Sequence, residues 1–151
     1  MTRTPIMLSL ILLIAMTLTA GCGVKDKTGP GEVRWDRDIC ARCVMAVSDH
    51  EFSAQVRGGP TGRNTKLYFF DDIGCAVLWL AEQPWRKNER TEIWVTDWRD
   101  GSWIDARTAW YVDGKTTPMD FGLGAQPEQA ENALKYGQAI VHINNRNQKA
   151  H

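Results

Sequence analysis

The sequence predicts an α+β fold made of two small β-β-α-β units. Between residues 52 and 98, two runs with strand-like alternation precede a run with helical spacing, and a third alternating run follows it. A weaker copy of this order lies between residues 103 and 143. The 151 residues are enough for one domain or for two very small ones. We therefore expect a first unit over residues 34–99 and a second unit over residues 100–143.

The first unit has the clearer pattern. Phe52–Val56 alternates apolar and polar residues, and Leu67–Phe70 follows a glycine-rich turn, so both segments are expected to be strands. Asp71 or Asp72 can cap the helix that comes next, which a proline ends. Residues 92–98 alternate again and are expected to return as a strand.

The second unit is predicted from shorter runs. Trp103–Ile104 and Trp110–Val112 are short strand candidates, and a loop with three glycines covers residues 114–125. A proline in the first turn indicates a helix over residues 127–136. Residues 139–143 are expected to close the unit as a strand.

Both ends of the chain are predicted to lie outside the folded part. Residues 1–21 have the charged start, apolar centre and small residues of a signal peptide, and Cys22 follows directly, as in a bacterial lipoprotein lipobox. A plain secretory signal and an uncleaved anchor are the alternatives. Residues 22–33 read as a flexible tether, and residues 144–151 as a disordered tail. Lipidation of Cys22 would place the protein on the periplasmic face of a bacterial membrane, with the outer membrane favoured.

Several classes of function are disfavoured by the sequence. The formal net charge is zero, so no footprint of nucleic-acid binding is visible. We find no arrangement typical of a serine-type triad, no glycine-rich phosphate loop and no nucleotide fingerprint. A hydrolase or a nucleotide-dependent enzyme is therefore not expected.

Chemistry is concentrated in the segment Cys40–Met45, which holds two thiols and a thioether. Cys40, Cys43 and Met45 offer soft sulfur donors, which suit Cu(I) better than zinc or a hard ion. If Val44 is extended, Cys43 and Met45 point to the same face. The motif alone also fits a redox pair, half of a zinc site or a structural disulfide. With Cys22 lipidated, three cysteines remain, so they cannot all pair within one chain.

Other residues are weaker candidates. Met119 lies in a loop with glycines nearby, where core packing explains a methionine less readily, and so it is a candidate sulfur ligand. Cys75 is expected to be a buried, inert thiol inside the first helix. Asp71 and Asp72 could cap that helix, support the ligands from behind or bind the metal, and capping is favoured because carboxylates are hard donors for Cu(I). Imidazole suits copper, and this keeps two histidines, His50 and His142, as reserve ligands.

The order of these motifs resembles the NosL family of copper-binding lipoproteins. The resemblance spans about residues 33–139 and implies two β-β-α-β units related to a domain of organomercurial lyase. It also implies a Cu(I) metallochaperone that passes copper to apo nitrous oxide reductase, the last enzyme of denitrification, or to its membrane assembly machinery. It is carried by four segments in the same order, Cys40–Met45, Phe52–Val56, Phe70–Cys75 and Thr117–Met119, together with the lipobox.

The resemblance also implies a set of metal ligands. Cys40, Cys43, Met45 and Met119 match the soft donors of the family pattern, and no catalytic residue is implied. Val44 is the clearest departure, because the family pattern usually has glycine there, and β-branched valine resists the backbone conformations open to glycine. The position of Asp120 also commonly holds glycine.

Two other classes of function are kept beside the metallochaperone. A thiol-disulfide oxidoreductase or an organomercurial-lyase-like enzyme would use Cys40 and Cys43 for catalysis. A structural lipoprotein would hold its fold with one disulfide. The sequence leaves open whether two copies share the metal in a homodimer.

Overall fold

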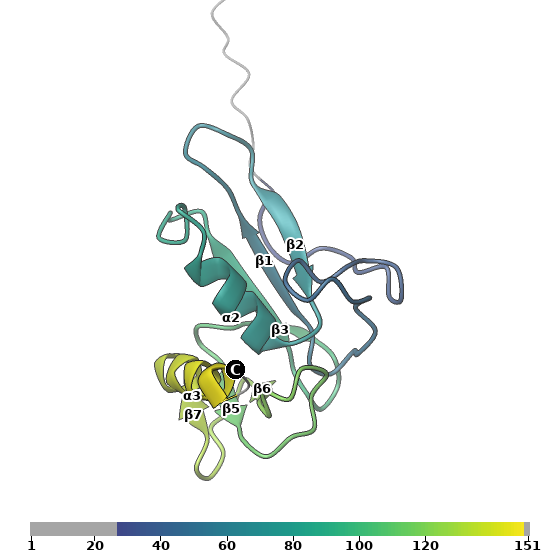
Figure 1. Cartoon of the computed structure of the whole chain (residues 1–151), viewed down its shortest axis with the longest axis vertical. Coiled ribbons are helices and arrows are strands. Elements are labelled where there is room, and N and C mark those ends of the chain that lie inside the picture. Colours follow the sequence, from purple (N-terminus) through teal and green to yellow (C-terminus); the bar gives the residue numbers. More distant parts are fainter. Residues whose placement is uncertain (1–26, 150–151) are drawn as a thin grey trace, which may run out of the picture.

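The structure is a computed structural model that describes residues 27–149 of the chain. It contains a four-stranded antiparallel sheet in the order β2-β1-β3-β4 and a three-stranded antiparallel sheet in the order β6-β5-β7 (Figure 1). Helix α2 lies against the larger sheet, and helix α3 lies beside the smaller one. The predicted α+β class is therefore confirmed.

The larger sheet has β1 (Ala54–Gly58) near its centre. Strand β2 (Lys66–Phe70) pairs with one side of it, and β3 (Glu92–Thr96) pairs with the other. Helix α2 (Ile73–Ala81) connects these two neighbours. The first predicted β-β-α-β order is thus confirmed, with boundaries shifted by one or two residues.

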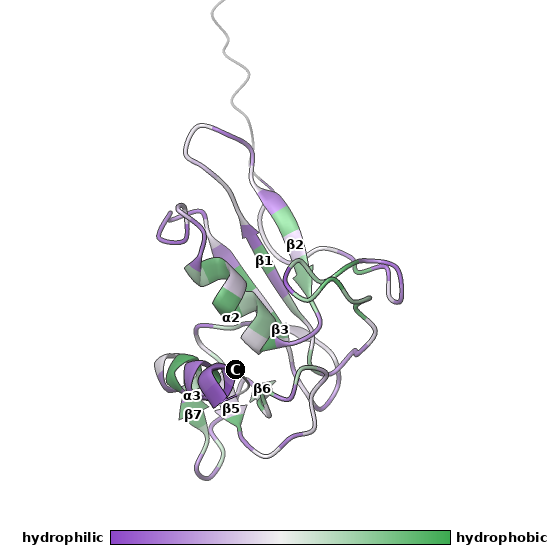
Figure 2. Cartoon of the chain, viewed as in Figure 1, coloured by the Kyte–Doolittle hydropathy of each residue, from purple (hydrophilic) through white to green (hydrophobic). Residues whose placement is uncertain are grey.

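Helix α2 begins as the sequence predicts. The carboxylate of Asp72 accepts a hydrogen bond of 2.8 Å from the backbone N–H of Gly74, which is an N-cap interaction. The helix is apolar around most of its circumference (Figure 2). A short helix of this composition is stabilised mainly by burial of its side chains. The buried residues are Ile73, Gly74, Cys75, Ala76, Val77 and Leu80.

The following strands divide between the two sheets. Strand β4 (Trp103–Asp105) pairs with β3 and extends the larger sheet. Strand β5 (Trp110–Val112) is central in the smaller sheet, between β6 (Gly124–Gln126) and β7 (Leu134–Lys135). Both short tryptophan-containing strands were predicted, but the sequence did not show that they lie in different sheets.

The predicted elements near the C-terminus are wrong. Residues 127–133 are irregular, with a bend and a turn, and α3 (Tyr136–Lys149) replaces the predicted strand over residues 139–143 and most of the predicted disordered tail. The helix predicted over residues 127–136 fails because residues 134–135 pair with β5 instead. Ala139 and Ile143 are both buried, and their separation of four residues puts them on one helix face.

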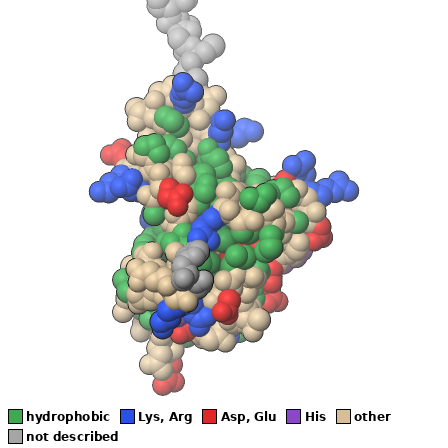
Figure 3. Space-filling model, in the orientation of Figure 1, with side chains coloured by type: hydrophobic (Ala, Val, Ile, Leu, Met, Phe, Trp, Pro, Cys, Tyr) green, Lys and Arg blue, Asp and Glu red, His purple; other side chains and the backbone are tan. Residues whose placement is uncertain are grey.

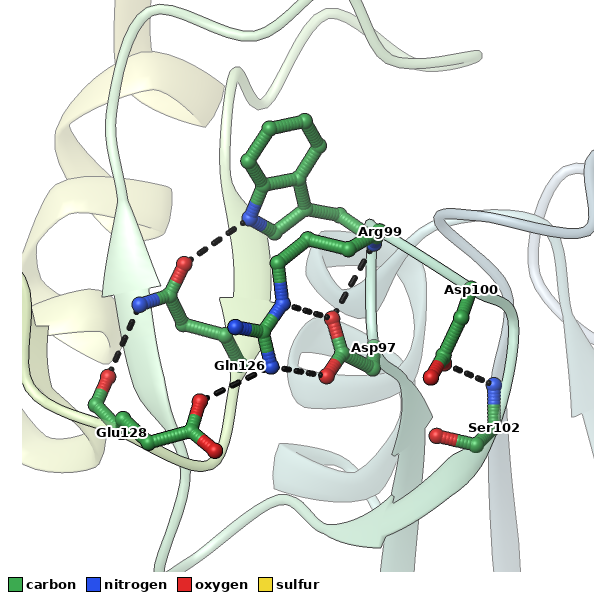
Figure 4. A network of polar contacts seen from close by, with 7 residues as sticks. Asp97, Arg99, Asp100, Ser102, Gln126 and Glu128 are labelled. Carbon is green, nitrogen blue, oxygen red and sulfur yellow. Dashed lines mark hydrogen bonds and ion pairs between the residues drawn. The ribbon is translucent and has the colours of Figure 1, made fainter.

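A polar network joins the two sheets where β3 ends (Figure 4). The N–H of Trp98 donates to the carbonyl of Ala125 at 2.9 Å, so the backbone after β3 reaches the smaller sheet. The guanidinium of Arg99 contacts Asp97 at 2.6 Å and Glu128 at 2.8 Å. These contacts hold the two sheets in one body.

The segment before the first strand is more fixed than a tether. The backbone N–H and carbonyl of Gly31 both bond to the side chain of Gln55, and the N–H of Gly29 donates to Glu92. The predicted flexible tether is therefore wrong for residues 29–33. The predicted signal peptide and Cys22 lie outside the described residues. None of the helices within residues 27–149 has the length and apolar character needed to cross a bilayer.

Candidate metal centre

The segment Cys40–Met45 folds as a single tight loop. The carbonyl of Cys40 accepts from the N–H of Val44 at 3.0 Å, and the N–H of Cys40 donates to the carbonyl of Met45 at 2.8 Å. Ile39 and Ala46 form an isolated bridge that closes the loop. Cys40 and Met45 are therefore adjacent at the base of the loop, with Cys43 near its tip.

Val44 closes this loop in an unusual conformation. Its φ of 66° lies in the left-handed region, where a β-branched residue is strained. Val44 is therefore not extended, so the condition under which Cys43 and Met45 would share one face of a strand is not met. The turn rotates Cys43 towards the protein, while the side chain of Met45 remains 48% exposed.

The loop is attached to the free edge of β2. The N–H of Ala41 donates to the carbonyl of Phe69 at 2.9 Å, and Cys40 forms a parallel bridge with Phe69. Asp71 comes two residues after Phe69, and Cys75 lies in the first turn of α2. The attachment therefore brings the Cys40 loop to the place where β2 ends and α2 begins.

Four side chains meet at this place. The Sγ atoms of Cys40, Cys43 and Cys75 and a carboxylate oxygen of Asp71 all lie within 4.8 Å of one another. All three cysteines are free thiols. Cys40, Cys75 and Asp71 are buried, and Cys43 is half-buried. Three sulfurs and one oxygen at such separations form a candidate metal centre.

Hydrogen bonds connect these four groups and change their acidity. A hydrogen bond from the thiol of Cys75, helped by the backbone N–H groups of Cys43, Asp71 and Arg42, lowers the pKa of Cys40 to about 4 against the opposing effect of burial. The same bond and burial raise the pKa of Cys75. Burial raises the pKa of Cys43 to about 11. The cluster therefore stabilises one thiolate, at Cys40, beside two protonated thiols.

Asp71 contributes the only carboxylate of the cluster. The Cys43 sulfur lies 3.5 Å from Oδ1 and 3.6 Å from Oδ2 of Asp71, so the thiol donates to the carboxylate. Burial raises the pKa of Asp71 to about 6, and the negative charge at Cys40 acts in the same direction. Asp71 is thus held against the sulfurs, while the neighbouring Asp72 caps α2.

The two predicted methionine ligands lie on the cysteine loop and on a loop next to it. Met45 lies on the loop and is exposed. Figure 3 shows that hydrophobic side chains reach the surface on this face of the molecule. Met119 packs against the core and lines a pocket of about 610 Å³ that Arg42 also lines. Arg42 precedes Cys43, so the Met119 loop lies next to the cysteine loop.

The histidines have other partners. His50 stacks on Trp35 with ring centroids 3.8 Å apart. His142 lies on α3, where its Nε2 atom is 3.0 Å from the carbonyl oxygen of Phe121 and 3.6 Å from a carboxylate oxygen of Asp113. Neither reserve ligand is part of the four-residue cluster.

The sequence placed Cys75 and Asp71 outside the site. Cys75 is buried, as predicted, but it contacts Cys40 and so is not remote from the chemistry. Its position in the first turn of α2 was a usable signal, because a helix N-terminus favours a thiolate. Asp71 carried no comparable signal, since either aspartate before the helix could serve as the cap.

Comparison with known proteins decides the family. Among protein-family models, NosL matches residues 34–135, which is well over half of the chain. The chain belongs to the NosL family. The crystal structure of the copper chaperone NosL from Shewanella denitrificans is also similar, with a TM-score of 0.54 and 19% identity. The match covers 79% of this chain and 89% of that one. No curated protein matches the sequence.

Two residues beside the predicted ligands have a left-handed backbone. The φ angles of Val44 and Asp120 are 66° and 56°. Aspartate tolerates this conformation much better than valine does. The turn at Val44 therefore holds a valine in a backbone conformation that glycine adopts more easily.

Proposed function

We propose that this protein is a membrane-anchored Cu(I) metallochaperone that delivers copper to nitrous oxide reductase during its maturation. Cys40, Cys43, Met45 and Met119 are its proposed copper ligands, and Cys22 is its proposed lipidation site. The proposal includes the periplasmic face of a bacterial membrane as the place of action. Apo nitrous oxide reductase and its membrane assembly machinery are the proposed acceptors.

One observation carries the proposal. Two of the proposed sulfur ligands, Cys40 and Cys43, are free thiols within 4.8 Å of one another, and Cys43 is half-buried on a loop where Val44 and Met45 are exposed. Thiolates are the protein donors that Cu(I) prefers, and a site with one side open allows ligand exchange with an acceptor. Membership of the NosL family supports the copper assignment, and so does the fold that the chain shares with a copper chaperone.

The exposed surface of the loop suits transfer. Val44 and Met45 are 74% and 48% exposed, so an acceptor can reach the loop without unfolding the core. Met45 offers a thioether at this surface, and such a weak, soft ligand can release Cu(I) to incoming thiolates. Transfer by exchange of ligands requires no catalytic residue.

The test of copper binding is a titration of the reduced chain with Cu(I) under anaerobic conditions, against a chromogenic chelator. We expect the protein to withdraw one Cu(I) from the chelator, and a Cys43→Ser, Met119→Leu double variant to lose most of this competition. His50→Gln is the matched control, because His50 stacks on Trp35 and not on the cluster. Failure of the unsubstituted chain to compete, or undiminished competition by the double variant, would disprove the proposal.

Delivery and anchoring need separate tests. Copper-loaded protein is expected to restore the copper absorption bands of apo nitrous oxide reductase, whereas the loaded chelator alone is expected to do so more slowly. Cys22→Ser is expected to move the protein from the membrane fraction to the soluble fraction or to leave its signal uncleaved. An unchanged membrane fraction with normal processing would contradict the lipid anchor.

The enzyme alternatives make opposite predictions. An oxidoreductase would reduce insulin disulfides, and a lyase-like enzyme would cleave an organomercurial carbon–mercury bond. We expect neither activity from the reduced chain. Either one, if abolished by Cys43→Ser, would replace the metallochaperone proposal.

A further inference from the structure

One end of the larger sheet carries an excess of positive charge. This hairpin end consists of Lys27, the loop 59–65 between β1 and β2, Lys66 at the start of β2, and the loop 82–91 between α2 and β3. It contains six basic and two acidic residues, whereas the other described residues contain ten basic and fifteen acidic ones. Figure 3 shows Lys and Arg side chains in blue near this upper end of the view.

Hydrogen bonds fix the two loops of the hairpin end against each other. The side-chain amide of Asn88 donates to the hydroxyl of Thr61 at 3.2 Å. The guanidinium of Arg90 donates to the backbone carbonyls of Pro60 and Arg63 at 3.1 Å and 3.0 Å. The two loops therefore form one continuous surface, although about 20 residues separate them in the chain.

Most of the basic groups of this surface are available to an outside partner. The exposed ones are Lys27, Arg63, Lys66, Arg86 and Lys87. None of these five forms an ion pair with another residue in the range 27–149. Cations that lack a partner of opposite charge in the protein attract anions from solution or from a charged surface.

The surface between the two loops is hollowed and partly apolar. A pocket of about 690 Å³ lies there, and Pro60, Pro84, Trp85 and Lys87 are among the residues that line it. The side chain of Trp85 is half-buried. An indole ring beside lysine amines suits the boundary between a membrane and water, because the ring is amphipathic and the amines reach the headgroups.

The proposed lipid anchor is close to this surface. Lys27 is the first described residue, and its carbonyl accepts a hydrogen bond of 3.4 Å from the hydroxyl of Thr65. Cys22 precedes Lys27 by only five residues, which span at most about 18 Å when fully extended. A lipid on Cys22 would therefore hold the hairpin end next to the membrane. The smaller sheet, which follows the opposite end of β3, would point away from it (Figure 1).

We propose that the hairpin end is a membrane-contacting surface that binds the anionic headgroups of phospholipids such as phosphatidylglycerol. Its orientation at the membrane rests on the proposed lipidation of Cys22, whereas its attraction for anionic headgroups does not. Each basic residue near an anionic membrane strengthens binding about fivefold. The surface therefore adds a second, electrostatic attachment to the lipid anchor.

Contact at the hairpin end would also set the position of the cysteine loop. The loop forms a bridge with Phe69, which follows Lys66 by three residues in β2. A strand rises by about 3.3 Å per residue, so the loop lies about 10 Å along β2 from the basic surface. The exposed Val44 and Met45 would then be held at a fixed, small distance from the headgroups, within reach of an acceptor in the same membrane.

The experiment measures co-sedimentation with lipid vesicles. A chain that lacks residues 1–21 and carries Cys22→Ser keeps every described residue and has no lipid, so neither the anchor nor copper affects the result. We expect it to bind vesicles of phosphatidylethanolamine and phosphatidylglycerol in equal parts at low ionic strength, and not vesicles of phosphatidylcholine. Binding should disappear at about 1 M salt, where the screening length is about 3 Å. No binding to the anionic vesicles, or equal binding to both kinds, would overturn the proposal.

Two double variants with the same net charge locate the surface. Lys66→Glu, Lys87→Glu is expected to lower the partition coefficient for anionic vesicles by more than about 25-fold, since each lost lysine accounts for about fivefold. Arg107→Glu, Lys149→Glu reverses two exposed charges elsewhere and is expected to have a much smaller effect. Equal losses in the two variants would show that net charge alone matters and would overturn the proposal.

Two further measurements keep the outcomes separate. If circular dichroism shows that the reversed charges disturb the fold, Lys66→Gln, Lys87→Gln replaces the first variant, with an expected loss of about 25-fold. The membrane fraction of Cys22→Ser tests the lipid anchor independently. Vesicle binding by a protein that is not lipidated would keep the surface and overturn its orientation, whereas a lipidated protein whose unlipidated form does not bind would keep the anchor and overturn the surface.

Discussion

The hydroxyl of Thr117 donates a 2.5 Å hydrogen bond to Asp72, the residue that caps α2. The N–H of Met119 points to the same carboxylate oxygen at 3.4 Å. One buried carboxylate therefore positions both the start of the helix that carries Cys75 and the loop that carries Met119. Residues 45 positions apart in the chain become parts of one structural unit at the candidate metal centre.

Removal of this hydrogen bond is expected to destabilise the fold and the Met119 loop. Thr117→Val keeps the shape of the side chain but leaves the buried Asp72 carboxylate with one partner fewer, at a cost of about 1–3 kcal/mol in the free energy of unfolding. Urea unfolding measures this cost. Thr116→Val is the control, because Thr116 is exposed and its loss should change stability by less than about 0.5 kcal/mol. Equal effects of the two substitutions would contradict the role of Asp72.

Replacement of Val44 by glycine is expected to stabilise the protein. A β-branched residue in the left-handed region costs about 1–3 kcal/mol, and the 74% exposed side chain loses little packing when removed. Glycine also makes the unfolded chain more flexible, and this entropy reduces the expected gain in the free energy of unfolding by about 0.5–1 kcal/mol. Val44→Gly should therefore raise the free energy of unfolding by about 1 kcal/mol in urea titrations of the reduced chain.

Asn132 provides the matched control for this prediction. Its φ of 56° is also left-handed, but asparagine tolerates that region. Asn132→Gly should therefore change stability by much less than Val44→Gly. A Val44→Gly protein less stable than the parent would show that the turn is not strained.

A methyl group at Gly74 is expected to disturb the start of α2. A Cβ built there lies 2.2 Å from the ring of Phe121, so the ring or the helix must move. Gly74→Ala should destabilise the protein by about 1–3 kcal/mol. Gly137→Ala is the control, because nothing lies within 4 Å of its added methyl and it sits in α3. In thermal unfolding, the melting temperature of Gly137→Ala should equal or exceed that of the parent, and the melting temperature of Gly74→Ala should be lower.

The ion pair between Arg99 and Asp97, at the end of β3, is expected to weaken in acid. The hydrogen bond from Arg99 lowers the pKa of Asp97 against the effect of burial. A carboxyl with a lower pKa in the folded state stabilises the protein above its unfolded value of about 3.9, and this stabilisation is lost as the pH falls through the folded pKa. Asp97→Asn should therefore lower the melting temperature at pH 7 more than at about pH 3.

Arg99→Gln tests the same contact from the other partner. This substitution removes the guanidinium that lowers the pKa of Asp97. It should therefore also lower the melting temperature at pH 7 more than at about pH 3. Equal losses of melting temperature at both pH values in Asp97→Asn would show that the side chain acts by packing and not by charge.

Local patterns were sufficient for the first half of the fold. Strand alternation and the cap at Asp72 identified β1, β2, α2 and β3, because these signals depend on neighbouring residues. They failed near the C-terminus, where Leu134 pairs with Tyr111 and so takes the place of a predicted helix. The spacing of Ala139 and Ile143 allowed a helix, but a short alternating run reads equally well as a strand.

The sequence by itself determined the α+β class, the family and the cysteine loop, since each depends on residues close together or on motifs in a fixed order. Only the tertiary structure decided which side chains meet Cys40. Pairing of the loop with Phe69 brings Asp71 and Cys75 to the sulfurs, and the turn at Val44 aims Cys43 inward. These contacts join residues up to 35 positions apart in the chain, and the physical reason is that backbone pairing and burial, not local preference, set such distances.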